Sequence, residues 1–264
     1  MKATVFIGSG RIASALLAGL RLAEYKRPII VHSRNPKTLR DLKKRYRVAT
    51  ESNLTQAVSQ ASLLIIAVPP ASVTLLLGKI SPIKRSLTAI SLAAGIPFAK
   101  LRARLGPPVS WARAMPSPVC RTGHGLTGLA FERDFPAAAR GEVTKLFSSV
   151  GTIIEIPEPQ FDAFTVTYSC SHGYHALAVL AAAGQKLGLD RRTSLQAAAH
   201  ALAEGIISWR EGQTSLGDLL TEATTPGGIA AATMAAMDRA RYAIAVEKGL
   251  AAGLKRAQKN SANA

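Results

Sequence analysis

The sequence predicts an α/β fold in which a doubly wound sheet over residues 1–157 is followed by an all-α domain over residues 158–264. In the first part, short runs rich in Val, Ile and Leu alternate with amphipathic segments, which is typical of parallel strands joined by crossover helices. In the second part, the chain is rich in alanine, keeps a helical periodicity and shows no strand alternation. The two parts therefore differ in architecture.

The individual elements follow from these patterns in chain order. Strands are expected over residues 3–7 and 28–32, near 48, and over 63–68, 87–92, 109–112, 125–130 and 152–156. Helices are expected over residues 12–22, 36–46 and 54–59 in the first part, and near 160–187, 190–211, 215–222 and 229–258 in the second.

The first strand ends in a turn of the form G-x-G-x-x-A. Gly8 permits the tight turn, Gly10 lets a pyrophosphate approach the backbone, and Ala13 lets the following helix pack closely on the strand. Arg11 and Ile12 begin that helix, whose free N–H groups and positive dipole end favour phosphate. The motif predicts a Rossmann-type dinucleotide site, and the alternative is a structural turn that binds nothing.

The residues after the second strand indicate which dinucleotide binds. Recognition of the ribose of NAD calls for an acidic residue at this strand end, and the chain has none. It has Ser33, Arg34 and Asn35, with Lys37 just beyond, and these donors suit a 2'-phosphate. NADP(H) is therefore the expected cofactor, although a solvated basic turn capping the next helix is the alternative interpretation.

Two further strand ends should contribute to the ligand edge of the sheet. The run Ala67, Val68 and Pro69 ends one buried strand, and residues 91–96 end the next. Ligands of open α/β sheets bind outside the carboxyl ends of the strands. With Asn53, the run from Ala67 to Pro69 completes the predicted cofactor-binding set.

Composition narrows the class of protein. The net charge is +17, and all of the excess lies in residues 1–150, which hold 23 Lys and Arg against 6 acids, whereas residues 151–264 hold 10 against 10. A solvated basic face is favoured over a nucleic-acid site because aromatic residues that stack on bases are scarce. Two cysteines, Cys120 and Cys170, fit a reducing cytoplasm. No targeting peptide, membrane span or metal site is expected.

The order of motifs resembles the pyrroline-5-carboxylate reductase family over nearly the whole chain. The matching pieces are residues 6–13, 33–36, 67–68 with Pro70, 91–96, 113–116, 146–148 with 150–151, 161–163, 186–189 and 225–228. The resemblance implies a Rossmann domain, a helical domain that forms a homodimer or a higher homo-oligomer, and hydride transfer from NADPH to a cyclic C=N bond, which makes proline.

The resemblance also implies where the substrate binds. Its carboxylate would meet the loop of Gly227, Gly228, Ile229 and Ala230, at a helix start where N–H groups are free. From the residues alone, the alternative is that Pro226 and Gly227 only form a turn.

The departures from the family pattern gather at this substrate half. The usual threonine after the glycine pair is Ala230, and the usual Ser-Gly-Ser-Gly-Pro stretch keeps only its serines, Ser169 and Ser171. Thr225, either serine or a water would then supply the missing hydrogen bond. His172 is a candidate general acid, or alternatively a capping or packing residue.

The same departures leave open other classes of protein. One is a sister imine or keto reductase with another substrate, and another is a protein that binds NADP(H) without turnover. The β-hydroxyacid dehydrogenases are disfavoured because residues 160–190 hold no lysine followed four residues on by asparagine.

Overall fold

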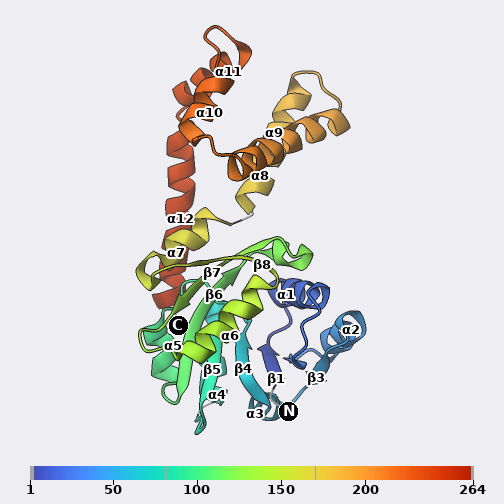
Figure 1. Cartoon of the computed structure of the whole chain (residues 1–264), viewed down its shortest axis with the longest axis vertical. Helices are drawn as coiled ribbons and strands as arrows, with labels where there is room; N and C mark the ends of the chain where they lie inside the picture. The colour runs from blue at the N-terminus through green and yellow to red at the C-terminus, as the bar shows by residue number, and fades with distance from the viewer. Residues whose placement is uncertain (1–2, 81, 170, 263–264) are drawn as a thin grey trace. The chain divides into compact units, whose positions relative to one another are not determined.

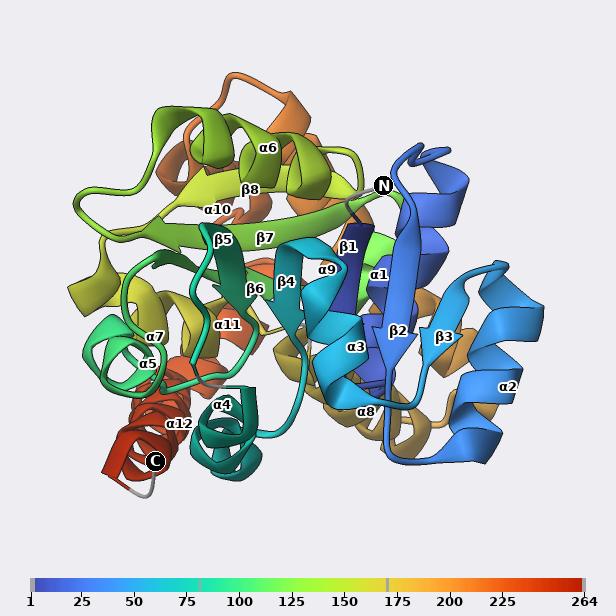
Figure 2. The same ribbon diagram turned by 90° about the horizontal axis from the view of Figure 1, so that it is seen from below.

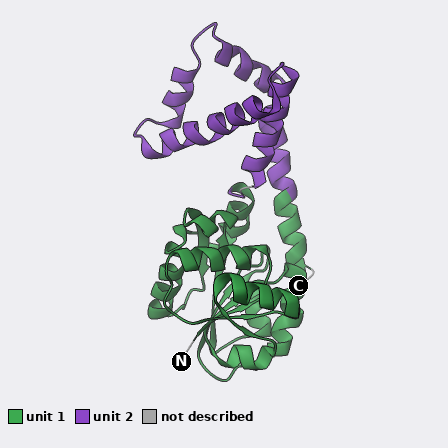
Figure 3. Cartoon of the chain, turned by 90° about the vertical axis from the view of Figure 1, so that its right-hand side faces the viewer, with its two compact units in different colours: residues 1–167, 253–264 green, residues 168–252 purple. Residues whose placement is uncertain are grey.

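The computed structural model describes residues 3–80, 82–169 and 171–262 (Figure 1). Its contacts divide the chain into two compact units, residues 1–167 with 253–264 (unit 1) and residues 168–252 (unit 2) (Figure 3). The predicted boundary at residue 157 precedes the helix α7 (Glu158–Thr167), which packs with unit 1. The boundary at residue 157 therefore remains a prediction about which part of the chain folds on its own. Cys170 lies outside the described residues.

Unit 1 contains the sheet and the helices around it. The strands are β1 (Ala3–Ile7), β2 (Ile29–His32), β3 (Ala49–Glu51), β4 (Ala61–Ile66), β5 (Leu87–Ser91), β6 (Val109–Pro116), β7 (Gly125–Phe131) and β8 (Gly151–Glu155). The helices are α1 (Arg11–Leu22), α2 (Pro36–Tyr46), α3 (Leu54–Ser59), α4 (Val73–Ile80), α5 (Phe98–Arg104), α6 (Ala137–Ser148) and α7, with short 3-10 turns η1 (Pro70–Ser72) and η2 (Pro118–Thr122).

The described strands form one sheet in the order β3-β2-β1-β4-β5-β6-β7-β8. Strand β1 lies between β2 and β4, and Ile7 pairs in register with both His32 and Ile66. The chain therefore builds the β2 and β3 side of the sheet first and the side of β4 to β8 afterwards. The carboxyl ends of β1, β2 and β4 meet at this switch point, where doubly wound sheets bind ligands.

One pairing departs from the predicted parallel alternation. Strands β6 and β7 are antiparallel, with Ala112 opposite Phe131, whereas the other neighbouring strands are parallel. The expectation of crossover helices throughout the sheet was wrong here. Only η2 and short turns join these two strands, and a parallel connection needs a dozen residues or more.

Helices lie on both faces of the sheet (Figure 2), and the core has two layers, one on each face. In β4, Leu63 and Ile65 face the cluster that includes residues of α1, α2 and α6, while Leu64 and Ile66 face the cluster that includes residues of α3, α4 and α5. Side chains alternate between the faces of a strand, so a continuous apolar run fills both layers.

Unit 2 is helical. It comprises α8 (Ser171–Lys186), α9 (Arg191–Glu211), α10 (Leu216–Ala223), α11 (Ile229–Arg239) and the first part of α12 (Tyr242–Ala262), whose last turns belong to unit 1. Within this unit α8 packs on α9, where the buried Ser194 Oγ donates to the Ala181 carbonyl. No helix in the described part of the chain combines the length and the apolarity that a membrane span requires.

Two helices predicted as single segments are each divided in two. The expected helix near 160–187 is α7 followed by α8, and the expected helix near 229–258 is α11 followed by α12. Arg241 adopts a left-handed backbone with φ of 59°, and its N–H donates to the Asp238 carbonyl at 2.8 Å. This closes α11 without the glycine or proline that marks a helix end in sequence.

Candidate active site

The turn after β1 is built around Gly8. Its φ is 117°, and a Cβ at this position would lie 2.3 Å from the carbonyl oxygen of Ala67. The Gly8 N–H donates to the His32 carbonyl at 2.9 Å, while the Ala67 N–H donates to the Ile7 carbonyl at 2.8 Å. Gly8 therefore lies where the ends of β1, β2 and β4 meet, and both its conformation and the lack of space there exclude a side chain.

The start of α1 is left open toward ligands. Gly10 is its N-cap, no side chain caps the helix there, and the first turn holds no acidic residue. A Cβ at Gly10 would meet nothing within 4 Å, so the backbone borders open space. Arg11 is exposed in this first turn, and Ile12 is half-buried. Unpaired N–H groups and the helix dipole favour an anion at this place.

A groove of about 460 Å³ leads from this turn along α1. It is lined by Ser9, Gly10, Arg11, Ser14, Ala15, Ala18, Arg45, Tyr46 and Arg121. The lining holds three guanidinium groups and no carboxylate, so the groove beside the glycine turn is positively charged.

The end of β2 carries the predicted 2'-phosphate residues. Ser9 Oγ donates to Ser33 Oγ at 2.8 Å, which links the glycine turn to the second strand end. Asn35 Oδ1 accepts from the N–H groups of Lys37 and Thr38 and caps α2. The Asn35 oxygen is therefore engaged by the helix. Arg34 and Lys37 are both exposed, so they are charged donors available at this edge.

The other predicted cofactor residues lie at two neighbouring places. Ala67, Val68 and Pro69 follow β4, directly across the turn from Gly8. Asn53 follows β3 at the end of the sheet and caps α3, its Oδ1 accepting from the Gln56 N–H at 3.0 Å. The structure brings the β1, β2 and β4 residues together and places Asn53 one strand further out, beyond β2.

The predicted substrate residues lie in unit 2, at two helix starts. At α8, Ser169 Oγ and Ser171 Oγ are 2.7 Å apart, and the His172 N–H donates to the Ser169 carbonyl at 3.0 Å. His172 is exposed in the first turn of the helix.

The second of these helix starts is that of α11. Gly227 has a φ of 76°, and the Gly228 N–H donates to the Thr225 carbonyl at 2.9 Å. Gly228 is the N-cap of α11, again without a side-chain cap or an acidic first turn. Ile229 is 90% exposed, and Ala230 beside it is also exposed. The geometry suits an anion at the helix start, and it offers no hydroxyl from Ala230.

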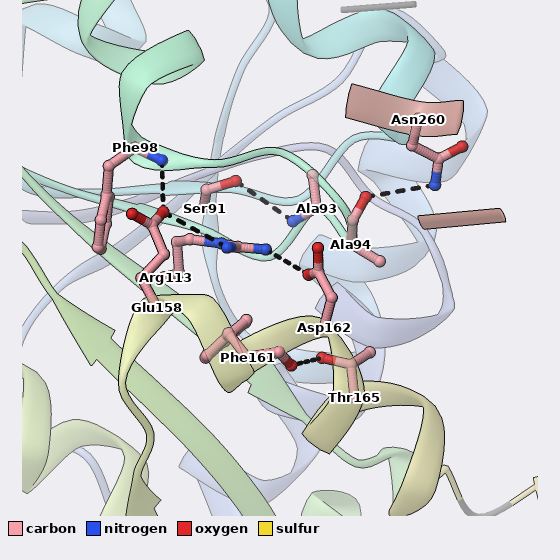
Figure 4. A network of polar contacts seen from close by, with 10 residues as sticks. All are labelled: Ser91, Ala93, Ala94, Phe98, Arg113, Glu158, Phe161, Asp162, Thr165 and Asn260. Atoms are coloured by element: carbon pink, nitrogen blue, oxygen red, sulfur yellow. Dashed lines mark hydrogen bonds and ion pairs between the residues drawn. The ribbon is translucent and has the colours of Figure 1, made fainter. Parts of the chain in front are cut away.

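A buried ionic cluster was missed as a site by sequence reasoning, which used Arg113, Phe161 and Asp162 only as motif matches and did not single out Glu158. Arg113 of β6 is 2% exposed, and its Nη2 donates to Asp162 Oδ1 at 2.7 Å while its Nη1 lies 3.5 Å from Glu158 Oε1 (Figure 4). Its guanidinium also stacks over Phe161, 4.4 Å from the ring centroid. The only signal in the sequence is an arginine among the mostly apolar residues of β6, just past the predicted strand end at residue 112.

The described residues offer little for metal or thiol chemistry. Burial raises the pKa of the Cys120 thiol to about 11, so this group stays protonated and is a poor nucleophile at neutral pH. No group of three or more potential metal-ligating His, Cys, Asp or Glu side chains gathers in the part of the chain that the structure describes.

Comparisons with known proteins match two families, one in each part of the chain. Residues 4–95 match the family described as NADP oxidoreductase coenzyme F420-dependent, and residues 158–260 match the family described as pyrroline-5-carboxylate reductase dimerisation. Among solved structures, the pyrroline carboxylate reductase of Plasmodium falciparum with NADP bound has the same fold, with a TM-score of 0.89 at 22% identity over 98% of each chain.

Curated relatives match along almost their whole length. The pyrroline-5-carboxylate reductase of Pseudomonas aeruginosa is 30% identical over 266 residues, which cover 95% of this chain and 94% of that protein. The enzyme of the same name from Mycobacterium tuberculosis is 27% identical over 98% of this chain and 96% of its own. By this similarity along both of its parts, the chain belongs to the pyrroline-5-carboxylate reductase family.

Proposed function

We propose that this protein is an NADPH-dependent oxidoreductase that reduces the C=N bond of 1-pyrroline-5-carboxylate and so makes proline. The observation that carries the proposal is the open, uncapped start of α1 after Gly8 and Gly10. Curated pyrroline-5-carboxylate reductases match the chain over most of its length. A cytoplasmic location is proposed with it, supported by the unpaired thiol of Cys120.

The residues at the glycine turn fit a dinucleotide. The first N–H groups of α1 and the exposed Arg11 would hold the pyrophosphate, and Gly10 leaves the space for it. Ser33 and Arg34 would bind the 2'-phosphate, because β2 ends without a carboxylate that would repel it. The residues after β4, from Ala67 to Pro69, would lie along the other half of the cofactor. When bound, NADPH supplies the hydride.

The substrate half has a simpler task, because a protonated cyclic imine is already electrophilic. The reaction adds a hydride to the imine carbon, leaves the nitrogen as an amine, and consumes one proton in total. The start of α11 at Gly228 and Ile229 would bind the substrate carboxylate through N–H groups and the helix dipole. Thr225, Ser169 and Ser171 are the hydroxyl groups proposed to replace the one that Ala230 lacks, and His172 is the proposed proton donor.

The proposed assembly is a homodimer or larger homo-oligomer through the helical part. It is supported by the match of residues 158–260 to a dimerisation family and by the large apolar side chains that α8, α9 and α10 expose in a single chain. A small-molecule imine is the proposed substrate, and no role for nucleic acid is proposed.

One observation favours a second candidate. Ile229 and Ala230 place two apolar side chains at the α11 start. This composition favours a sister reductase whose imine or ketone needs no hydroxyl partner there, or a protein that retains NADP(H) without turnover.

The deciding assay mixes purified protein with NADPH and 1-pyrroline-5-carboxylate at neutral pH and follows NADPH oxidation at 340 nm, about the absorption maximum of the reduced nicotinamide. NADH and the six-membered ring analogue serve as parallel arms. Fast turnover of the five-membered ring with NADPH supports the proposal. Preference for the larger ring identifies a sister reductase, and tight NADPH binding without turnover of either ring rejects proline formation and points to a different substrate or a non-catalytic role.

A further inference from the structure

Residues 92–97, which we name the β5 loop, connect β5 to α5 at the carboxyl edge of the sheet. The Leu92 N–H donates to the Ile66 carbonyl at 3.0 Å, so the loop begins beside the end of β4. Ser91 is 1% exposed, and its Oγ accepts from the Ala93 N–H at 3.3 Å. With β2 assigned to the adenosine half of a dinucleotide, the β4 and β5 side of the switch point receives the nicotinamide half.

The last turns of α12 pack directly against this loop. Gly95 has a φ of 76°, and a Cβ at this position would lie 2.2 Å from the carbonyl oxygen of Ala257. Ala257 itself is buried. Because even a methyl group would not fit, the two backbones are in contact, and a shift of α12 displaces the loop.

Hydrogen bonds from residues of α12 and α7 hold the middle of the loop and the start of α5 that follows it. Asn260 Nδ2 donates to the Ala94 carbonyl at 3.3 Å, and Figure 4 shows this side chain directed from α12 toward the loop. Where the loop enters α5, the Phe98 N–H donates to Glu158 Oε1 at 2.6 Å, and the same carboxylate pairs with the buried Arg113.

We propose that Asn260 is a positioning residue for the reductase reaction: together with the contact between Ala257 and Gly95, it holds the β5 loop in the place that aligns the nicotinamide half of NADPH. This inference rests on the proposed function. If the β5 loop loses the contacts with Asn260 and Ala257, the glycine turn, Arg11 and Arg34 remain in place. The adenosine half of the cofactor is therefore held as before, while the alignment needed for hydride transfer is lost.

The test compares Asn260→Ala with Gln258→Ala, which removes an exposed amide from the same turn of α12. Binding of NADP⁺ and of 2',5'-ADP, which carries only the adenosine half, is measured by titration calorimetry on the full chain. Loss of one hydrogen bond predicts a rise of about threefold to tenfold in the Kd of NADP⁺ for Asn260→Ala. The Kd of 2',5'-ADP should remain that of the wild type, and Gln258→Ala should change neither constant.

Turnover and rescue complete the experiment. In Asn260→Ala, kcat for imine reduction should fall while the KM for the imine changes little, and Asn260→Gln, which keeps an amide donor, should recover part of the loss. Equal weakening of NADP⁺ and 2',5'-ADP, or unchanged binding of both, overturns the proposal. A wild-type protein that binds NADP⁺ without reducing the imine rejects the proposed function instead, and the two binding constants still decide whether Asn260 positions the loop.

Discussion

Arg34 is the residue on which cofactor choice depends in our interpretation. It is exposed at the end of β2, where Asn35 is occupied in capping α2 and β2 itself ends without a carboxylate. Arg34→Ala should raise the KM for NADPH about tenfold, equivalent to about 1.4 kcal/mol, and leave the KM for NADH nearly unchanged. Steady-state kinetics with both cofactors measure this. Arg40→Ala, on the exposed face of α2, is the control with the same charge change, and equal losses for NADPH and NADH would remove the assignment.

At this scale the sequence predicts backbone requirements better than side-chain roles. The need for glycine at Gly8 follows from the motif and is met by its φ and its contact with Ala67. By contrast, the sequence left open whether the turn at Asn35 caps the next helix, and the oxygens of Asn35 and Asn53 both serve as helix caps. An asparagine before a helix satisfies either interpretation, and only the N–H groups that it accepts from distinguish them.

Helix α7 is tied to the sheet by a buried charge, and this gives a prediction at the scale of elements. Arg113 is almost fully buried, so removing a carboxylate partner leaves a poorly compensated charge in the core, which typically costs 3–5 kcal/mol. Glu158 remains beside it in Asp162→Ala, so we expect a loss of about 2 kcal/mol in the free energy of unfolding.

Denaturant unfolding followed by circular dichroism checks this loss. Glu155→Ala is the matched control, because it breaks an ion pair with Arg140 that is about half exposed and should cost at most about 1 kcal/mol. If the two variants lose the same stability, the Arg113 cluster does not secure α7.

The start of α11 provides a second prediction at this scale. A Cβ at Gly228 would lie 3.0 Å from the Thr225 carbonyl, and a valine there would also cover the helix N–H groups. Gly228→Val should abolish imine turnover while NADPH affinity survives, as measured by kinetics and fluorescence titration. Gly78→Ala, at a helical position of α4 with open space, should leave both unchanged. Retained turnover in Gly228→Val would place the substrate elsewhere.

Helices whose starts carry clear sequence signals are the ones whose bounds the sequence predicts well. The bounds of α2 and α3 agree with the expected ranges, because Asn35 and Asn53 cap these helices and Pro36 begins the first of them. The division between α11 and α12 escapes prediction because Arg241 turns the chain without glycine or proline. The antiparallel pairing of β6 and β7 likewise depends on connection length, which the strand pattern alone does not express.

For the whole molecule, the sequence predicts two parts of different architecture and the family to which they belong, but it does not predict how the parts share residues. Alanine-rich helical periodicity gave no reason to expect that the end of α12 packs with the sheet unit. That contact joins Ala257 and Asn260 to a loop more than 160 residues earlier, with a separation of 166 between Asn260 and Ala94. Only tertiary packing specifies such a pairing.

The last prediction concerns assembly. Ile206 and Trp209 of α9 are 57% and 45% exposed in the single chain, among other large apolar side chains of unit 2. Apolar surface of this kind is stabilised when a second copy covers it. Trp209→Glu combined with Ile206→Glu should therefore convert the oligomer to monomers, because each new carboxylate would be buried without a partner. Sedimentation velocity measures the state directly. Leu75→Glu, on the exposed face of α4 in unit 1, should leave the oligomer intact. An unchanged sedimentation coefficient in the double variant would place the interface on another face of the helical part.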